Sequence, residues 1–100
     1  MLDLKKHMPA ITKLCQRYSV KRLSIYGSAM TRDFNRKSDV DFIVKYDRRK
    51  IKSLVDVYFG LVEDLEKHFK RPVDLMIEGP VRNPYLREGI KQTRKLIYEG

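Results

Sequence analysis

Apolar positions recur along this chain with two different periods, and the changes of period divide it into helices and strands. The clearest stripe predicts a helix over residues 50–69, because its apolar positions follow one another in steps of three and four. A shorter stripe predicts a helix over residues 8–18, with Pro9 in the first turn, where backbone N–H groups have no helical partner. An Asn-Pro pair, typical of a helix start, opens a third predicted helix over residues 83–93.

Alternation with period two predicts the strands between these helices. The predicted strands cover residues 21–27, 38–46 and 71–79, and the tail at 95–100 is a candidate edge strand. Strands that alternate with long helices favour an α/β (α+β) fold, a small mixed β-sheet with helices packed on it. At 100 residues we expect a single domain over residues 1–100, with one modest core.

Two carboxylates interrupt the second predicted strand. Asp39 and Asp41 lie two residues apart, so the pleat of a strand turns them to the same side. Val40, Phe42 and Val44 point to the other side, into the core. Carboxylates this close raise each other's pKa, and burying them unpaired is costly, so a positive group must offset them. An arginine or lysine from a neighbouring strand would serve, and so would a divalent metal, for which two oxygen ligands on one face suit Mg²⁺.

A third carboxylate, Asp74, stands between Val73 and Leu75 in the third predicted strand and faces away from both. If that strand pairs beside the second one, Asp74 joins Asp39 and Asp41 at one site. Three carboxylates on adjacent strands form the arrangement that two-metal phosphoryl transfer uses. Asp74 would then bind the second metal ion or accept the proton of the attacking hydroxyl. The structural alternative is a solvated or salt-bridged strand end.

The Gly27-Ser28 pair ends the first predicted strand and supplies the other half of a phosphate site. Glycine lets the backbone approach a phosphate closely, and Ser28 is a good cap for a helical turn whose free N–H groups would point at it. The pair does not belong to a Walker A loop. In isolation it would be a plain turn glycine and a plain cap. Together with Asp39 and Asp41 it indicates a nucleoside triphosphate site with bound Mg²⁺.

Gly27-Ser28, followed after ten residues by Asp39-x-Asp41, resembles the signature of the polymerase-β-like nucleotidyltransferases. More narrowly, nearly the whole chain resembles the minimal nucleotidyltransferase (MNT) antitoxins of HEPN-domain toxins. The resemblance implies ATP- and Mg²⁺-dependent transfer of AMP, with release of pyrophosphate, to a tyrosine hydroxyl of the toxin. It also implies that Gly27 and Ser28 bind triphosphate, that Asp39 and Asp41 are catalytic metal ligands, and that Asp74 is the third carboxylate.

The loop after Ser28 departs from the family pattern. Relatives usually continue with x-Ala-Arg-Gly, whereas this chain has Ala29-Met30-Thr31-Arg32, so the arginine is displaced by one position. Arg32 is expected to contact the triphosphate or to lie on the surface. Larger members of the superfamily carry an extra domain that holds the acceptor, and the 100 residues leave no room for one. We therefore expect another macromolecule, most simply the HEPN toxin, to present the acceptor.

The charge balance adds rival interpretations. A net charge of +9, from 22 Lys and Arg against 13 Asp and Glu, indicates an anionic partner or a solvated basic surface. Basic clusters at 36–37, 48–52 and 70–71 suit a polyphosphate cleft as well as nucleic acid, but few aromatic residues lie between them to stack bases. Two rivals remain: a binding module that masks a toxin without catalysis, and a nucleotidyltransferase acting on RNA or a small molecule.

The remaining chemistry-bearing residues have simple interpretations. Cys15 is the only cysteine and falls on an apolar stripe, which predicts a core position. A lone cysteine, no signal peptide and no apolar run of about 20 residues favour a cytoplasmic location. His7 and His68 lack metal-ligand spacing and are expected on the surface. Three tyrosines are expected at the rim of the core: Tyr58, Tyr85 and Tyr98.

Overall fold

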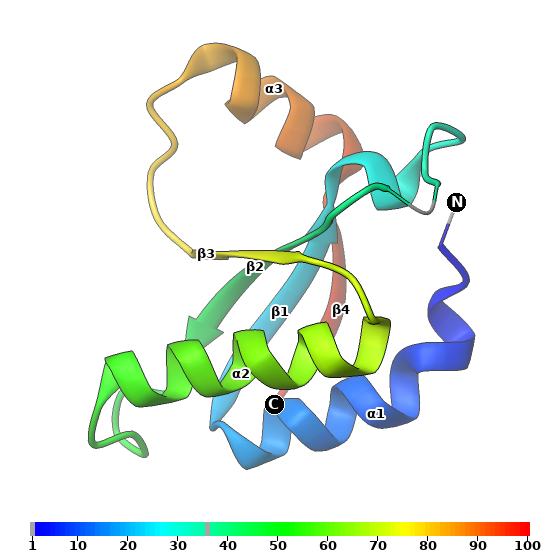
Figure 1. Ribbon diagram of the computed structural model, residues 1–100. Helices are drawn as coiled ribbons and strands as arrows, with labels where there is room; N and C mark the ends of the chain where they lie inside the picture. The colour runs from blue at the N-terminus through cyan, green and yellow to red at the C-terminus, as the bar shows by residue number, and fades with distance from the viewer. Residues whose placement is uncertain (1, 36) are drawn as a thin grey trace.

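The computed structural model describes residues 2–35 and 37–100, which form a four-stranded sheet, three α-helices and one short 3₁₀ turn (Figure 1). Arg36, from one of the basic clusters, lies outside the described residues. Within them, no helix is long and apolar enough to cross a membrane. The elements in chain order are α1 (Leu4–Arg17), β1 (Val20–Tyr26), η1 (Gly27–Met30), β2 (Val40–Tyr46), α2 (Leu54–Phe69), β3 (Val73–Ile77), α3 (Pro84–Thr93) and β4 (Lys95–Glu99).

The four strands form one mixed sheet in the order β3-β2-β1-β4. β1 runs antiparallel to both β2 and β4, whereas β2 and β3 are parallel. A parallel pair needs a long crossover, and α2 supplies it. The predicted fold class is confirmed, including the pairing of the C-terminal tail as an edge strand and the helix that opens at Asn83-Pro84.

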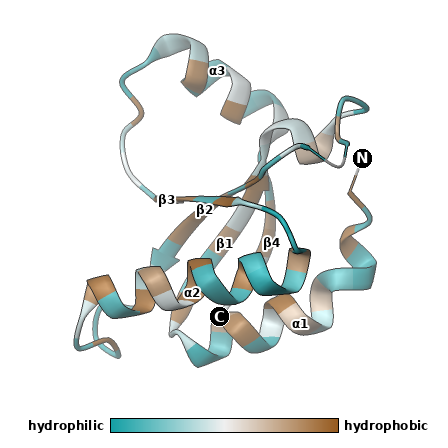
Figure 2. Ribbon diagram, viewed as in Figure 1, coloured by the Kyte–Doolittle hydropathy of each residue, from teal (hydrophilic) through white to brown (hydrophobic). Residues whose placement is uncertain are grey.

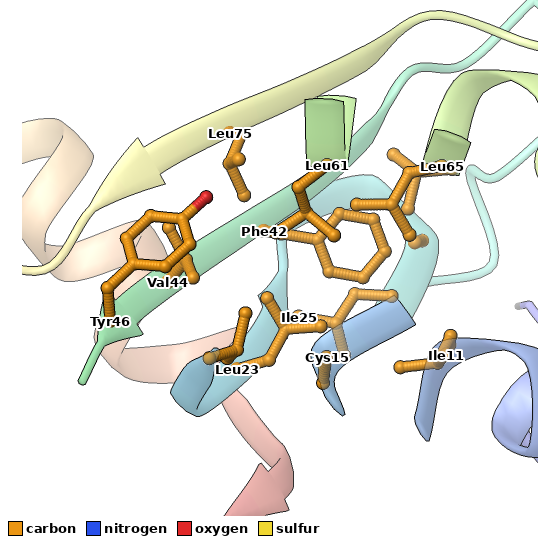
Figure 3. Packing of buried hydrophobic residues seen from close by; sticks show 13 residues of the cluster. Ile11, Cys15, Leu23, Ile25, Phe42, Val44, Tyr46, Leu61, Leu65 and Leu75 are labelled. Atoms are coloured by element: carbon orange, nitrogen blue, oxygen red, sulfur yellow. The ribbon is translucent and has the colours of Figure 1, made fainter. Parts of the chain in front are cut away.

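One face of the sheet carries the main core. Val40, Phe42 and Val44 are fully buried on it, as their alternation predicts, and they pack against the apolar stripes of α1 and α2 (Figure 3). These two helices lie side by side across the sheet, and their hydrophobic positions are visible as brown bands in Figure 2. Each fully buried large apolar side chain contributes about 1.5–3 kcal/mol, so this face supplies most of the hydrophobic stabilisation.

The opposite face of the sheet is covered by α3. Ile90 of α3 is buried against Tyr26 of β1 and Ile43 of β2, with Met76 and Val81 at the edge of this smaller cluster. Alternation places these strand residues on the face that also carries Asp41. The carboxylate side of the sheet is therefore the side that α3 shares.

The first helix begins at Leu4, four residues before the predicted start, so Pro9 lies inside the helix and not in its first turn. That prediction was wrong because the apolar stripe extends further towards the N-terminus. Leu4 and Met8 continue the helical spacing of Ile11 and pack against the core. Their burial outweighs the hydrogen bond that proline cannot donate.

The second helix starts at Leu54, later than the predicted residue 50, because Ser53 caps it. The Ser53 hydroxyl accepts a hydrogen bond from the N–H of Asp56 at 3.3 Å. Ile51 belongs to the apolar pattern and packs against the core, but it does so from the connection before the helix. Local capping chemistry, rather than hydrophobic spacing, sets this boundary.

Two expectations for single side chains were wrong. His7 and His68 are partly buried, and His7 Nδ1 lies 2.8 Å from His68 Nε2, because the early start of α1 brings His7 against the end of α2. Burial and the nearby His68 lower the pKa of His7. Tyr85 is 89% exposed and not at the core rim, since α3 turns it outward. Cys15 is fully buried as predicted, and burial raises the pKa of its thiol to about 12.

Gly60 allows the end of α1 to approach the middle of α2. A Cβ atom at Gly60 would lie 2.6 Å from Cε1 of Tyr18, much closer than a packing contact. The Tyr18 hydroxyl donates a hydrogen bond to Asp64 one turn further along α2, at 2.5 Å. Gly60 lowers the helix propensity of α2. In return, the missing side chain leaves room for Tyr18 to pack against the helix.

Candidate active site

Two of the predicted carboxylates are direct neighbours in the sheet. The parallel register of β2 and β3 pairs Asp41 with Asp74, and the antiparallel register of β1 and β2 pairs Asp41 with Tyr26. Residues that face each other in register lie on the same side of a sheet, so these three side chains form one row. Asp39 lies just before β2 and is exposed, so it adjoins the row from the preceding connection. The prediction that placed Asp39 inside the strand was wrong, because β1 ends at Tyr26, the partner of Asp41, and offers Asp39 no pairing residue.

The row is electrostatically negative. Burial, followed by the charges of Asp74 and Asp39, raises the pKa of Asp41 to about 6. Burial and the same pair of carboxylates, Asp41 and Asp74, raise the pKa of Tyr26 to about 12. Among residues 2–35 and 37–100, no arginine or lysine forms an ion pair with Asp39, Asp41 or Asp74. The arginine or lysine that the sequence left open as an offsetting group is therefore not found among the described residues.

The donor set suits a cation that also takes ligands from a substrate. Over the part of the chain described, no three or more histidine, cysteine, aspartate or glutamate side chains gather closely enough to hold a metal ion by themselves. Mg²⁺ does not require such a cage, because it commonly binds through one or two carboxylates, waters and substrate phosphates. Asp41, with Asp74 beside it and Asp39 at the strand entrance, would supply the carboxylate ligands.

Gly27 lies directly against Asp41. Its φ of +78° is a left-handed backbone conformation that favours glycine, and a Cβ atom there would lie 2.6 Å from Asp41 Oδ2. The Asp41 carboxylate therefore points at the Gly27 backbone where β1 passes into η1. Ser28 is partly exposed in η1, and Ala29 after it is fully buried, which anchors the turn to the core. A short helical turn is present as predicted, but it starts at Gly27, one residue earlier, so that Ser28 lies inside the turn and does not cap it.

Thr93, at the end of α3, holds this turn and was missed in the sequence. The N–H of Gly27 donates a hydrogen bond to Thr93 Oγ1 at 2.8 Å, and the Thr93 hydroxyl donates to the carbonyl of Gly89 at 2.6 Å. The two residues are 66 positions apart, so no local pattern connects them. Because the Gly27 N–H has this partner, phosphate donors in the present conformation would come from Ser28 onward.

We expect Thr93→Val, which keeps the shape but removes the hydroxyl, to loosen the Gly27 turn. The exchange of the Gly27 amide with deuterium should accelerate, and nucleoside triphosphate affinity should fall about fivefold, the equivalent of one ordinary hydrogen bond. Amide exchange by NMR and a nucleotide titration measure the two effects. Thr93→Ser retains the hydroxyl and serves as the control. Unchanged Gly27 exchange in Thr93→Val would contradict the assigned role.

Arg32 is not tied to the carboxylates by any contact among the described residues. It is exposed in the connection between η1 and β2. Its contact with a triphosphate therefore stays a prediction. The residues that the fold does bring together are Gly27, Ser28, Asp41 and Asp74, with Asp39 next to them.

The sequence of this chain matches a known protein family. The model of the family described as "Polymerase beta, Nucleotidyltransferase" matches residues 10–100. The chain is 32% identical over 95 residues to the candidate protein adenylyltransferase MJ1379 of Methanocaldococcus jannaschii, with 95% of this chain and 89% of that protein covered. A second candidate protein adenylyltransferase of that organism, MJ0128, is 31% identical over 99 residues.

Solved structures extend the comparison. A candidate minimal nucleotidyltransferase aligns with a TM-score of 0.68 and 26% identity, covering 92% of this chain and 90% of that one. A toxin–antitoxin crystal structure with AMP-PNP aligns with a TM-score of 0.67 and 18% identity, covering 93% of this chain and 73% of that one. The structure of a tri-AMPylated Shewanella oneidensis HEPN toxin in complex with MNT antitoxin aligns with a TM-score of 0.61 and 16% identity, covering 96% of this chain and 72% of that one. At these low identities, the two toxin–antitoxin structures show a shared fold. Since the family model spans nearly the whole chain, this protein belongs to the polymerase-β nucleotidyltransferases, as one of their minimal members.

Proposed function

We propose that this nucleotidyltransferase transfers AMP from ATP to a hydroxyl group of a partner protein, specifically a tyrosine of a HEPN ribonuclease toxin that it thereby neutralises. The observation that carries the proposal is the row of Asp41 and Asp74 against the left-handed Gly27 turn, a place for both a metal ion and a polyphosphate. Relatives that are 31–32% identical carry the name of protein adenylyltransferases, which supports a protein acceptor.

Each residue of the site has a role in this reaction. Asp39 and Asp41 would bind Mg²⁺, and Ser28 with the N–H groups that follow it would hold the triphosphate, which the glycine at position 27 lets approach closely. Asp74 would bind a second ion or accept the acceptor's proton. Bound Mg²⁺ supplies charge neutralisation at the phosphates and lowers the pKa of the attacking hydroxyl. The acceptor oxygen forms a bond to the α-phosphorus, the bond from that phosphorus to the bridging oxygen of pyrophosphate breaks, and the hydroxyl proton passes to Asp74 or, where Asp74 binds metal, to water.

The first test is the intact mass of the partner. The chain is purified together with the protein that co-purifies with it, and the complex is incubated with ATP and Mg²⁺. We expect the partner to gain mass in whole AMP increments, and the Asp39→Asn/Asp41→Asn variant to leave its mass unchanged. A complex whose partner keeps its mass with the unmodified enzyme would contradict transfer and favour masking by contact alone.

The rival that acts on RNA rests on the net charge of +9. It is tested in parallel by incubating the enzyme with RNA and labelled ATP. Incorporation of label into RNA, with none into the protein partner, would replace the proposed acceptor. A steep fall of RNA affinity with salt would by itself report only electrostatic attraction.

A further inference from the structure

A basic pocket lies beside α3. It has a volume of about 490 Å³ and lies between α3 and the connection from β3. Val81 and Ile90 give it an apolar floor. Its cationic wall comes from one side of α3, where Arg87, Lys91 and Arg94 follow each other in helical steps.

The charge in this pocket is only partly neutralised. Glu78 accepts hydrogen bonds from both Arg94 and Arg22, each at 2.8 Å, so one carboxylate serves two guanidinium groups. Arg87 and Lys91 are exposed, and within the described residues neither forms an ion pair. The pocket therefore carries an excess of positive charge next to an apolar floor, which suits an acidic side chain flanked by an apolar one.

The pocket and the row of Tyr26, Asp41 and Asp74 share one face of the sheet. Ile90 lines the pocket and also packs against Tyr26, which is paired with Asp41. Thr93, one turn further along α3, bonds to Gly27. A chain bound along α3 would consequently lie next to the carboxylates, as an acceptor must.

The start of α3 adds an exposed apolar surface. Tyr85 is 89% exposed and Leu86 is 43% exposed, directly before Arg87 in the sequence. Tyrosine and arginine are among the residues enriched where proteins recognise one another. We propose that α3 and its basic pocket form the docking surface for the acceptor protein, which places an acidic segment against Arg87 and Lys91. This inference rests on the proposed function and specifies how its acceptor is chosen.

An acidic protein segment fits this surface better than RNA does. Proteins that hold single-stranded RNA stack successive bases on several aromatic rings. Among the described residues none of those that line the pocket is aromatic, and Tyr85 at the start of α3 offers a single ring. The floor is aliphatic instead, and aliphatic groups pack well with the stems of glutamate and with neighbouring apolar side chains. RNA binding at the same surface is the outcome that the experiment must distinguish.

The test measures binding without nucleotide, so that it does not depend on catalysis. The probe is a random copolymer of glutamate and tyrosine, which presents acidic groups together with phenol hydroxyls, and a lysine–tyrosine copolymer is the probe of opposite charge. We expect the protein to bind the acidic copolymer more tightly, and Arg87→Glu/Lys91→Glu to weaken that binding at least about tenfold. Fluorescence anisotropy at several salt concentrations gives the affinities.

A matched variant separates the surface from total charge. Lys5→Glu/Lys13→Glu changes the net charge by the same amount at exposed positions of α1, on the other face of the sheet, and should weaken binding less than about threefold. Circular dichroism melting verifies that both variants fold. Equal losses in the two variants, or no binding by the unmodified protein, would overturn the proposal. So would tighter binding of poly(U) that Arg87→Glu/Lys91→Glu abolishes, since the surface would then recognise RNA.

Discussion

Asp41→Asn should abolish AMP transfer and, at the same time, make the metal-free protein more stable at neutral pH. Activity is expected to fall at least about 10³-fold, because a bound metal ion contributes several kcal/mol of charge stabilisation in the transition state. Stability should rise because the ionised Asp41 is partly buried beside Asp74 without an ion pair among the described residues. A residue that serves only the fold would not show this opposition of activity and stability.

The pH dependence of the stability gain follows from the raised pKa of Asp41, about 6 in the folded protein against an ordinary 3.8. Between these values the folded state binds more protons at this site than the unfolded chain, so the stability of the unmodified protein falls as pH rises through this window. Asp41→Asn should therefore match the unmodified protein below about pH 4 and exceed it above pH 6. Solvent screening at this partly exposed carboxyl limits the expected gain to about 1 kcal/mol, or about 5 °C in Tm.

Thermal melts from pH 4 to 8, with and without Mg²⁺, measure these effects. Mg²⁺ should raise the Tm of the unmodified protein at pH 7.5. This increase should disappear below pH 6, because Asp41 becomes protonated and no longer binds the ion. The Tm of Asp41→Asn should not change when Mg²⁺ is added. Glu63→Gln removes an exposed carboxylate on α2 and is the control for net charge. A stability gain in Asp41→Asn that is the same at pH 4 and pH 7.5 would contradict the electrostatic cause.

Gly27→Ala is expected to reduce activity at least about 10²-fold and to destabilise the fold. The left-handed φ of +78° costs an alanine about 1–2 kcal/mol, which corresponds to a fall in Tm of about 5–10 °C. The new methyl group would also lie 2.6 Å from Asp41 Oδ2 and displace that carboxylate. A displacement of about 1 Å at a reacting centre lowers the rate about 10²-fold. Activity at saturating ATP and the melting temperature are the two measurements.

Gly89→Ala is the matched control, because the same substitution should have the opposite effect on stability. Gly89 lies inside α3, and a Cβ atom there would meet nothing within 4 Å. Alanine is the better helix former, so the free energy of unfolding should rise by about 0.5–1 kcal/mol, with no loss of nucleotide affinity. If Gly27→Ala melts as Gly89→Ala does and remains active, the close approach of Asp41 to Gly27 is not required.

The sequence alone determined the features that depend on neighbouring residues. Period-two alternation placed Asp41 and Val40 on opposite faces of a strand, and the Asn83-Pro84 pair set the start of α3. Gly27-Ser28 could be identified as a turn next to a strand because glycine and serine have local backbone preferences. These features are local, since each rests on the dihedral angles and caps of a few consecutive residues.

Only the tertiary structure decided which of these pieces meet. Asp74 became the partner of Asp41 because β3 pairs with β2 in one particular register, whereas Asp39 fell just outside the strand. Thr93 reached Gly27 because α3 crosses the carboxylate face of the sheet, a contact between residues 66 positions apart. Such contacts depend on how the hydrophobic faces of distant elements pack together, and the pattern of any single segment leaves that packing open.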